Sequence, residues 1–255
     1  MSSVLIIGLG NVGLRHLEGC LKIKKLKYIY TVEKKNSRIN LCKKLFKYHI
    51  FFKKIKFLKN INKINSDLAI ISTNSKERLN LTKKIITKNK IKNVILEKFL
   101  TSKKSEINEY KKLILKADIW INHIYRYQDA FIFVKKILQK NKHKKLTVDI
   151  TGNNLNISSN LIHFVDYTSY FLNDKISILK IFFSKDSHWK KAKRSSYKEF
   201  FGDIDIIFKD NSKLTIKSKN DKKRPNYSQH KIVNIKNSFL IKNSYDVQKS
   251  MLKFN

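Results

Sequence analysis

Short apolar runs alternate with amphipathic stretches through the first half of the chain. The apolar runs are expected to be buried strands, and the stretches between them have the 3.6-residue spacing of helices. The strands are expected at 3–7, 28–32, 67–72, 93–96 and 118–121, and the helices at 11–23, 37–46, 76–88 and 103–115. Continuous apolar strands separated by helices predict a doubly wound α/β domain, with a parallel sheet covered on both faces.

After about residue 122 the pattern changes. Helices are expected at 129–139 and 159–172, and extended segments at 146–150, 178–184, 199–208, 214–218, 232–235 and 239–241. Polar and apolar residues alternate along the extended segments, which is typical of a largely antiparallel sheet with one wet face. The chain is therefore expected to form two domains: an α/β domain over residues 1–121, and an α+β domain with an open sheet over residues 122–255.

A glycine-rich turn follows the first expected strand. Gly8, Gly10 and Gly13 form a G-x-G-x-x-G pattern that opens a helix with Asn11 and Val12. In such a loop the first glycine allows the tight turn, the second lets a pyrophosphate approach the backbone, and the third lets helix and strand pack closely. The helix N-terminus offers N–H groups to phosphates. The loop predicts a Rossmann-type dinucleotide site, and it holds three of only six glycines.

The choice between NAD and NADP depends on the end of the second strand. Glu33 stands there, about 20 residues after the glycines, where a carboxylate accepts hydrogen bonds from both ribose hydroxyls of NAD. Lys34, Lys35 and Arg38 follow at once and would pair with the 2′-phosphate of NADP. Both cofactors remain open.

Length and composition fit a globular protein. The chain has 255 residues, 42% of them hydrophobic, which suffices for one large or two modest domains.

No apolar run approaches the roughly 20 residues of a membrane span, and no export signal precedes the first strand, so no membrane partner is expected. With only Cys20 and Cys42, a reduced cytoplasmic protein is expected. Neither cysteine has metal ligands near it in sequence, and no metal site is expected.

The formal net charge of +37 would ordinarily indicate nucleic-acid binding. Only six of the 56 basic residues are arginines, however, and arginine is the preferred side chain for phosphate and base contacts. The lysines are spread along the chain, and no nucleic-acid-binding module is recognised. No specific nucleic-acid partner is expected, and any binding should be weak and salt-sensitive.

Several short motifs, taken in order, resemble those of the Gfo/Idh/MocA oxidoreductases. They are the glycine loop continued by Arg15-His16, Ile70 to Asn74, Leu96 to Phe99, Asn122 to Tyr127, and Leu161 to Asp166. A further stretch, from Lys193-Arg194 to Gly202, resembles short members linked to surface-sugar biosynthesis. The resemblance covers roughly residues 3–220. It implies a nucleotide-binding Rossmann domain, a substrate domain whose open sheet forms a homo-oligomer interface, and hydride transfer between NAD(P) and a carbon of a sugar or sugar-nucleotide.

The resemblance also assigns site residues. Lys98 would position the substrate hydroxyl and shuttle its proton, and His163 would be the acid/base. Ser72, Thr73 and Asn74, which run under the nicotinamide half, and Glu97 would contact the cofactor, together with Gly8, Gly10, Asn11, Val12, Gly13, Glu33, Lys34 and Arg38. The substrate would be held by Arg15, Asn122, Arg126, Ser159 and Asp166. Asp166 lies one helical turn after His163 and is expected mainly to support it. The alternative for His163 is a core histidine on an apolar helix face.

Three departures from the family pattern keep a second function open. Phe99 replaces the proline that follows Glu-Lys, and Ser159 stands where many active members carry an aspartate. The chain stops at Asn255, whereas family members usually continue, so a C-terminally truncated copy is an alternative to a short variant. The leading hypothesis is an NAD(P)-dependent oxidoreductase of a sugar or sugar-nucleotide in surface-polysaccharide biosynthesis. The alternative is a non-catalytic nucleotide-binding or regulatory relative.

Overall fold

The computed structural model describes residues 2–62, 64–140, 145–173, 177–191, 198–219, 221, 226–234, 236–244 and 250–254. Lys193 and Arg194, and the last residue of the segment expected at 232–235, lie outside the described residues. The chain divides into two compact units, Met1–Asn122 and His123–Asn255.

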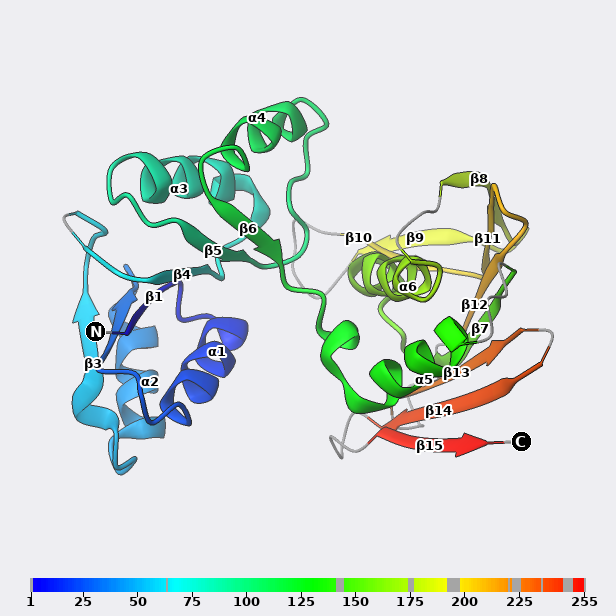
Figure 1. The fold of residues 1–255 in the computed structure, drawn as a ribbon, viewed down its shortest axis with the longest axis horizontal. Helices are drawn as coiled ribbons and strands as arrows, with labels where there is room; N and C mark the ends of the chain where they lie inside the picture. Colours follow the sequence, from blue (N-terminus) through cyan, green and yellow to red (C-terminus); the bar gives the residue numbers. More distant parts are fainter. Residues whose placement is uncertain are drawn as a thin grey trace. The chain divides into compact units, whose positions relative to one another are not determined.

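The N-terminal unit is a six-stranded parallel sheet between two helical layers (Figure 1). Its strand order, β3-β2-β1-β4-β5-β6, is that of the doubly wound dinucleotide-binding fold. The strands are β1 (Ser3–Ile7), β2 (Tyr28–Val32), β3 (Ile55–Leu58), β4 (Leu68–Ile71), β5 (Asn93–Leu96) and β6 (Asp118–Ile121), and the helices are α1 (Asn11–Leu21), α2 (Asn36–Phe46), α3 (Ser75–Thr87) and α4 (Glu106–Leu113). One apolar cluster packs α1 and α2 on the sheet, and another packs α3 and α4. The predicted fold class is confirmed for this unit.

Strand β3 was not predicted from the sequence. It is a four-residue edge strand that pairs only with β2, and lysines stand at Lys54, Lys56 and Lys59 in and around it. An edge strand needs little apolar surface, because only Ile55 is fully buried here. Its short apolar run, interrupted by lysines, therefore did not show the pattern of a buried strand.

The C-terminal unit carries a seven-stranded, mostly antiparallel sheet in the order β15-β14-β13-β7-β12-β11-β8 (Figure 1). Only the β7–β12 pair is parallel. The strands are β7 (Thr147–Asn153), β8 (Ile178–Phe183), β11 (Ile204–Phe208), β12 (Lys213–Lys219), β13 (Tyr227–Val233), β14 (Ser238–Ser244) and β15 (Ser250–Phe254); β9 (His188–Lys191) and β10 (Lys198–Phe201) form a separate pair. Helices α5 (Asp129–Lys140) and α6 (Ile157–Phe171) supply one side of the core. The predicted α+β class with a largely antiparallel sheet is confirmed.

Two expectations for this sheet were wrong in detail. The single segment expected at 199–208 is two strands, β10 and β11, which belong to different sheets and are separated at Gly202 and Asp203. Strand β13 begins at Tyr227, five residues before the expected segment. The first half of β13 was not predicted, because two of its fully buried residues, Ser228 and His230, are polar and break the apolar pattern of a strand.

Both cysteines are buried in the core cluster under α1 and α2. Burial raises the pKa of Cys20 and of Cys42 to about 11. At pH 8 the thiolate fraction should be about 100-fold lower than that of an ordinary protein thiol. We expect both thiols of the folded chain to react slowly with dithiobis(nitrobenzoate), and both to react rapidly in denaturant. Fast reaction in the native state would contradict this packing.

Within the part of the chain that the structure describes, no helix is both long and apolar enough to span a membrane.

Candidate active site

The glycine loop connects β1 to α1 in a conformation that requires glycine at two positions. Gly8 has a φ of +92°, and a Cβ on Gly13 would overlap the carbonyl oxygen of Gly8. The Ser72 hydroxyl, at the end of β4, donates to the carbonyl oxygens of Ile7 (3.0 Å) and Gly8 (2.7 Å). Ser72, predicted as a cofactor residue, thus also holds the turn in place.

The N-terminus of α1 is open to an anion. Gly10 is the N-cap residue, its backbone is extended, and no side chain caps the helix. A Cβ on Gly10 would meet only the guanidinium of Arg38, at 4.0 Å, and the first turn of α1 carries no acidic residue. Exposed N–H groups and the positive end of the helix dipole therefore face an unobstructed space, which fits the pyrophosphate of a dinucleotide.

Glu33 and Arg38 lie against the same loop. The two carboxylate oxygens of Glu33 accept hydrogen bonds from the N–H groups of Leu9 (2.8 Å) and Lys35 (2.9 Å). Arg38 donates from Nε to the Leu9 carbonyl (3.0 Å) and from Nη2 to Asn11 Oδ1 (2.9 Å). The structure therefore brings the predicted adenosine-end residues together at the end of β2, apart from Lys34, whose side chain is exposed.

The loop after β4 lies beside the glycine loop. The Thr73 methyl group would lie 3.3 Å from a Cβ on Gly8. Asn74 caps α3, with its Oδ1 accepting from the N–H groups of Lys76 (3.1 Å) and Glu77 (3.4 Å). The sequence prediction did not identify this cap, which fixes where the loop turns into the helix.

Glu97, directly after β5, is the centre of a buried hydrogen-bonded cluster. Its Oε1 accepts from Asn122 Nδ2 (2.7 Å) and from His16 Nε2 (2.6 Å). Burial raises the pKa of Glu97, but the hydrogen bonds from His16 and Asn122 outweigh burial and leave that pKa below its ordinary value. The carboxylate is therefore charged at neutral pH. The sequence predicted Glu97 as a cofactor residue and Asn122 as a substrate residue; it did not predict that they bond to each other.

His16 was missed as a site residue. The only signal for it was its place in the Arg15-His16 pair after the glycines. Arg15, the residue that was predicted, is exposed and pairs with Glu18 (Nη1 to Oε2, 3.1 Å).

Lys98 follows Glu97 at the carboxyl end of β5, where open α/β sheets bind their ligands. Burial lowers the pKa of Lys98, and the neighbouring charge of Glu97 partly opposes that shift. Its Nζ lies 5.8 Å from the ring centre of Phe99, and the Lys98–Phe99 peptide bond is cis. An ammonium group with a lowered pKa exchanges its proton more readily near neutral pH.

Arg78 joins the two loops that carry these residues. It is only 2% exposed, and its guanidinium donates to the Thr73 carbonyl (2.5 Å) after β4 and to the Phe99 carbonyl after β5. This role could not be predicted from the sequence, because one arginine on an amphipathic helix is ordinarily solvated.

Replacing Arg78 by methionine should leave both carbonyls without their charged donor. We expect a loss of roughly 3–5 kcal/mol of stability, the usual cost of breaking a buried charged hydrogen-bond network. The measurement is calorimetric unfolding, combined with hydrogen exchange of peptides that span residues 72–80 and 93–101. Faster exchange confined to these peptides is expected. The exposed Arg15→Met variant is the matched control, and equal stability of the two variants would contradict the role of Arg78.

In the C-terminal unit, Asp166 on α6 forms a two-pronged ion pair with Arg126. Arg126 lies in the short helix η2 (Ile124–Tyr127), and its Nε and Nη2 lie 2.7 and 2.8 Å from the two carboxylate oxygens. His123 Nε2 lies 3.7 Å from Asp166 Oδ1. Arg126 and Asp166, both predicted to bind substrate, thus bind each other. The ion pair orients the Arg126 guanidinium, and 26% of the Arg126 side chain remains accessible.

His163 is buried on α6 beside this ion pair. Its ring meets the rings of His123 and Tyr125 edge-on, each at 5.6 Å between centres. Ser159, one turn earlier, donates from its hydroxyl to the Asn156 carbonyl (3.1 Å). His163, His123, Arg126 and Asp166 form one polar cluster at the border of the C-terminal core.

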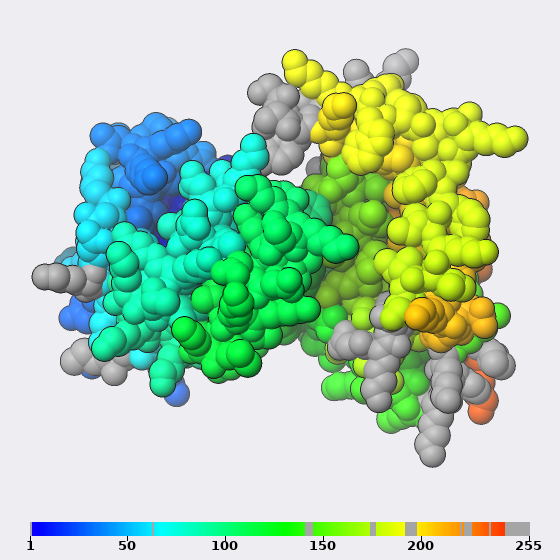
Figure 2. Space-filling model, turned by 90° about the horizontal axis from the view of Figure 1, so that it is seen from above, coloured from blue at the N-terminus to red at the C-terminus, as the bar shows by residue number. Residues whose placement is uncertain are grey.

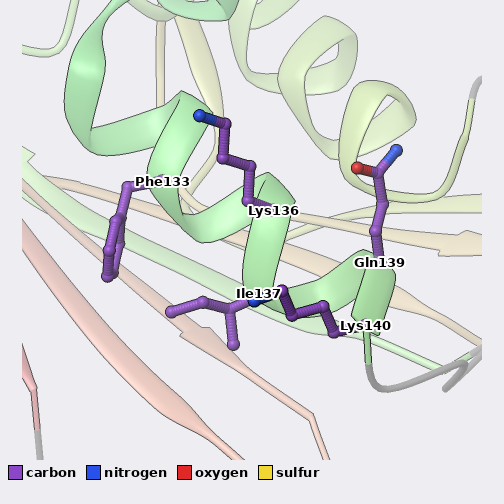
Figure 3. A pocket seen from close by; sticks show the side chains of 5 residues that line it. All are labelled: Phe133, Lys136, Ile137, Gln139 and Lys140. Atoms are coloured by element: carbon purple, nitrogen blue, oxygen red, sulfur yellow. The ribbon is translucent and has the colours of Figure 1, made fainter.

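A hollow of about 500 Å³ lies beside α5 in the C-terminal unit (Figure 3). It is lined by Phe133, Lys136, Ile137, Gln139 and Lys140. Its two lysines, Lys136 and Lys140, are exposed, and none of its lining residues belongs to the predicted site. Among the residues whose placement the structure gives, no group of three or more His, Cys, Asp or Glu side chains could hold a metal ion.

The fold is similar to solved structures that include dehydrogenases and a Gal80p super-repressor mutant. Scyllo-inositol dehydrogenase from Lactobacillus casei, with bound NAD(H) and scyllo-inositol, superimposes with a TM-score of 0.73 at 14% identity, over 94% of this chain and 76% of its own. UDP-N-acetylglucosamine 3-dehydrogenase from Acidithiobacillus ferrooxidans gives 0.71 at 11%, over 99% of this chain and 80% of its own. The super-repressor mutant of Gal80p from Saccharomyces cerevisiae gives 0.71 at 11%, over 100% and 79%. At these identities the likeness establishes the fold alone.

Sequence comparison is more specific for the N-terminal unit. No curated protein matches the chain. Residues 2–122, however, match the Gfo/Idh/MocA family model, described as an oxidoreductase family with an NAD-binding Rossmann fold. This segment holds the glycine loop, Glu33, and the Glu97–Lys98 pair. The N-terminal unit therefore matches the NAD-binding Rossmann domain of the Gfo/Idh/MocA oxidoreductase family.

Proposed function

We propose that this protein is a nicotinamide-dependent dehydrogenase or reductase that transfers a hydride to or from a CH–OH carbon of a sugar, polyol or sugar-nucleotide. The observation that carries the proposal is Lys98, a partly buried lysine with a lowered pKa at the carboxyl end of β5. It shares its unit with a glycine loop that fits a dinucleotide. A place in surface-polysaccharide biosynthesis is part of the proposal and rests on the sequence resemblance.

The chemistry divides between cofactor and chain. NAD, when bound, accepts the hydride from the carbinol carbon or returns it to the carbonyl carbon. In the oxidation direction the hydroxyl oxygen must also lose a proton, and Lys98 is the group that we assign to take it. The charged Glu97, fixed by His16 and Asn122, opposes the fall of the Lys98 pKa that burial causes.

The C-terminal unit supplies the remaining assignments of the proposal. His163 is the candidate acid/base there, by family resemblance and by its place beside Arg126 and Asp166. The accessible part of the Arg126 guanidinium suits a hydroxyl or an anionic group of the substrate. Ser159 of this unit, and Arg15 and Asn122 of the N-terminal unit, remain proposed substrate contacts.

We propose NAD as the preferred cofactor. The Glu33 carboxylate is held at the end of β2 by two backbone N–H groups, so it would have to move to admit a 2′-phosphate. Arg38, the cation best placed to receive that phosphate, is engaged with Leu9 and Asn11.

A homo-oligomer formed through the C-terminal sheet is also proposed. Edge strand β8 pairs only with β11, and its apolar side chains are exposed: Leu179 by 51%, Ile181 by 46%, Phe182 by 49% and Phe183 by 57%. A second copy would remove this surface from water. A monomer mass of 30.2 kDa in light scattering would contradict the proposal.

The function is tested by turnover with NAD on scyllo-inositol, myo-inositol and UDP-N-acetylglucosamine, the compounds named for structural relatives. Formation of NADH with one of them, and none in a Gly10→Asp variant, is the expected result. The broader panel includes other sugars, both cofactors and the reverse direction.

A non-catalytic relative is the second candidate. Phe99 and Ser159 depart from the family pattern, and the fold is equally that of the Gal80p super-repressor mutant. Saturable NADH binding without turnover on the whole panel would favour this candidate over the enzyme.

A further inference from the structure

Acidic residues are missing from one long stretch of the N-terminal unit. Residues 19–62 contain 14 lysines and arginines but a single acidic residue, Glu33, whose carboxylate is bound by two backbone N–H groups. The stretch runs from the end of α1 through β2 and α2 to the edge strand β3. The lysines are spread over the chain as expected, but in this stretch Glu33 is the single carboxylate among them; from outside the stretch, Glu18 Oε1 lies 3.8 Å from Lys22 Nζ.

Helix α2, within this stretch, presents a second apolar stripe to solvent. Its inward face is formed by Ile39 and Cys42, which are buried. Leu41 and Leu45 lie one helical turn apart on α2, and Tyr48, two residues past the end of the helix, continues the i, i+4, i+7 spacing. The three side chains are 37%, 58% and 86% exposed. A surface helix of a globular protein ordinarily turns a polar face to water, so this stripe is not accounted for by the fold.

Ile50, in the turn after the helix, extends the stripe and is 82% exposed. The lysines around the stripe are exposed as well: Lys43, Lys44, Lys47 and Lys53. Lys47 Nζ lies 4.5 Å from the ring centre of Tyr48. We call Leu45, Tyr48 and Ile50, with Lys44, Lys47 and Lys53, the α2 patch.

Further basic residues adjoin the α2 patch. Lys54 Nζ donates to the Lys24 carbonyl (2.9 Å), which brings the loop between α1 and β2, with exposed Lys24 and Lys25, beside residues 53–54. Lys43 Nζ lies 5.4 Å from the ring centre of Phe57 on β3, so α2 is next to the sheet edge (Figure 1). In Figure 2 the azure-blue residues of this region form part of the surface of the N-terminal unit.

We propose that the α2 patch binds the surface of an anionic lipid bilayer. Protruding Leu, Ile and Tyr side chains within a rim of lysines are the composition of segments that lie in the headgroup layer. Lysines gain about 1 kcal/mol each near an anionic bilayer surface, and their aliphatic stems tolerate partial burial. The expectation of no membrane partner rested on the lack of a spanning segment, which a peripheral contact does not need.

Charge and side-chain type favour this partner over two others. A second copy of the chain would present the same uncompensated positive face, and like charges repel. A nucleic acid would be expected to meet arginines and stacking aromatic rings, whereas the protruding groups here include the aliphatic Leu45 and Ile50. The apolar groups gain most in the apolar boundary of a lipid headgroup layer.

The test is co-sedimentation of the full chain with vesicles of phosphatidylcholine containing about 30% phosphatidylserine, at about 150 mM salt. Binding to these vesicles and not to pure phosphatidylcholine is expected, with weakening at higher salt. The variant Leu45→Ser/Tyr48→Ser/Ile50→Ser keeps the charge and should lose roughly tenfold or more in vesicle affinity. The variant Lys44→Gln/Lys47→Gln/Lys53→Gln should lose a similar factor.

Matched controls carry the same changes elsewhere in the same unit. Ile114→Ser/Leu115→Ser removes two other exposed apolar residues, and Lys104→Gln/Lys111→Gln/Lys116→Gln removes three other lysines. Both should bind vesicles like the original chain. The proposal is overturned if the original chain ignores anionic vesicles. It is also overturned if the apolar variant binds anionic vesicles as tightly as its control. A third contradictory outcome is that the lysine variant loses binding to duplex DNA while no variant changes vesicle binding. NADH binding of the α2 patch variants reports separately on the folded cofactor site.

Discussion

Replacing Lys98 by methionine is expected to lower turnover by about 10²–10⁴-fold, the usual contribution of a positioned acid/base group. NADH affinity should change little, because the glycine loop, Glu33 and Arg38 remain intact. Methionine keeps an unbranched apolar stem out to the ε-carbon and removes the amino group that carries the proton. The measurement compares kcat on the substrate identified by the panel with the Kd for NADH. Unchanged kcat would remove Lys98 from the mechanism.

Two controls separate the chemistry of Lys98 from its charge and surroundings. Lys103→Met, an exposed lysine of the same loop, should leave kcat unchanged. Glu97→Gln removes the charge that raises the pKa of Lys98, so that pKa should fall further. If deprotonated Lys98 accepts the proton in the oxidation direction, its titration in the pH–rate profile should move to lower pH. A profile that moves to higher pH would contradict the coupling between these two residues.

The C-terminal unit should lose stability steeply as the pH falls below about 6.5, because of His230. This histidine is fully buried on β13, and burial lowers its pKa to about 3 from the ordinary 6.5. Tyr167 Oη lies 2.7 Å from its Nδ1, and Ser228 Oγ lies 2.9 Å from its Nε2, so the neutral ring has partners on both sides.

The direction of this pH dependence follows from the pKa of His230 in the folded chain and its pKa in the unfolded chain. Above pH 6.5 the ring is neutral in both the folded and the unfolded chain, and the stability is fully present. Between about pH 6.5 and 3 the unfolded chain binds a proton that the folded chain does not. The free energy of unfolding therefore falls with pH, by up to about 5 kcal/mol at pH 3. A His230→Gln variant should be less stable at neutral pH and should lack this part of the acid dependence.

Urea unfolding at several pH values measures the effect. Trp189 packs against Phe200 in the C-terminal unit and serves as the fluorescent reporter in a Trp120→Phe background. The exposed His188→Gln is the matched control and should keep the acid dependence of the parent. Identical pH slopes for His230→Gln and its parent would show that another group governs acid unfolding.

The N-terminal fold was accessible from the sequence because its signals are local. Buried parallel strands are continuous apolar runs, and two glycines of the loop are required by the positive φ of Gly8 and by the contact between Gly13 and Gly8. Strand β3 lacked such a signal. Half of β13 was hidden for a different reason, since its buried Ser228 and His230 are polar positions that only the Tyr167 contact explains.

The site residues were predictable where a motif carries them, and their partners were not. Glu97 bonds to His16 across 81 positions and to Asn122 across 25, and no periodicity links such distant residues. The role of Arg78 could not be predicted either. Its partners are backbone carbonyls of two loops, and every residue type has such a carbonyl. Tertiary contacts of this kind become visible only when the sheet places its strand ends side by side.

A working dinucleotide site in the N-terminal unit is tested most directly by fluorescence titration with NADH and, separately, with NADPH. The titrations are made at about 150 mM salt, where loose electrostatic binding is largely screened. We predict saturable micromolar binding, tighter for NADH, that the Gly10→Asp variant abolishes, because an aspartate there would place a carboxylate in the space left for the pyrophosphate. The absence of saturable binding by either nucleotide would contradict the account and end the dehydrogenase proposal.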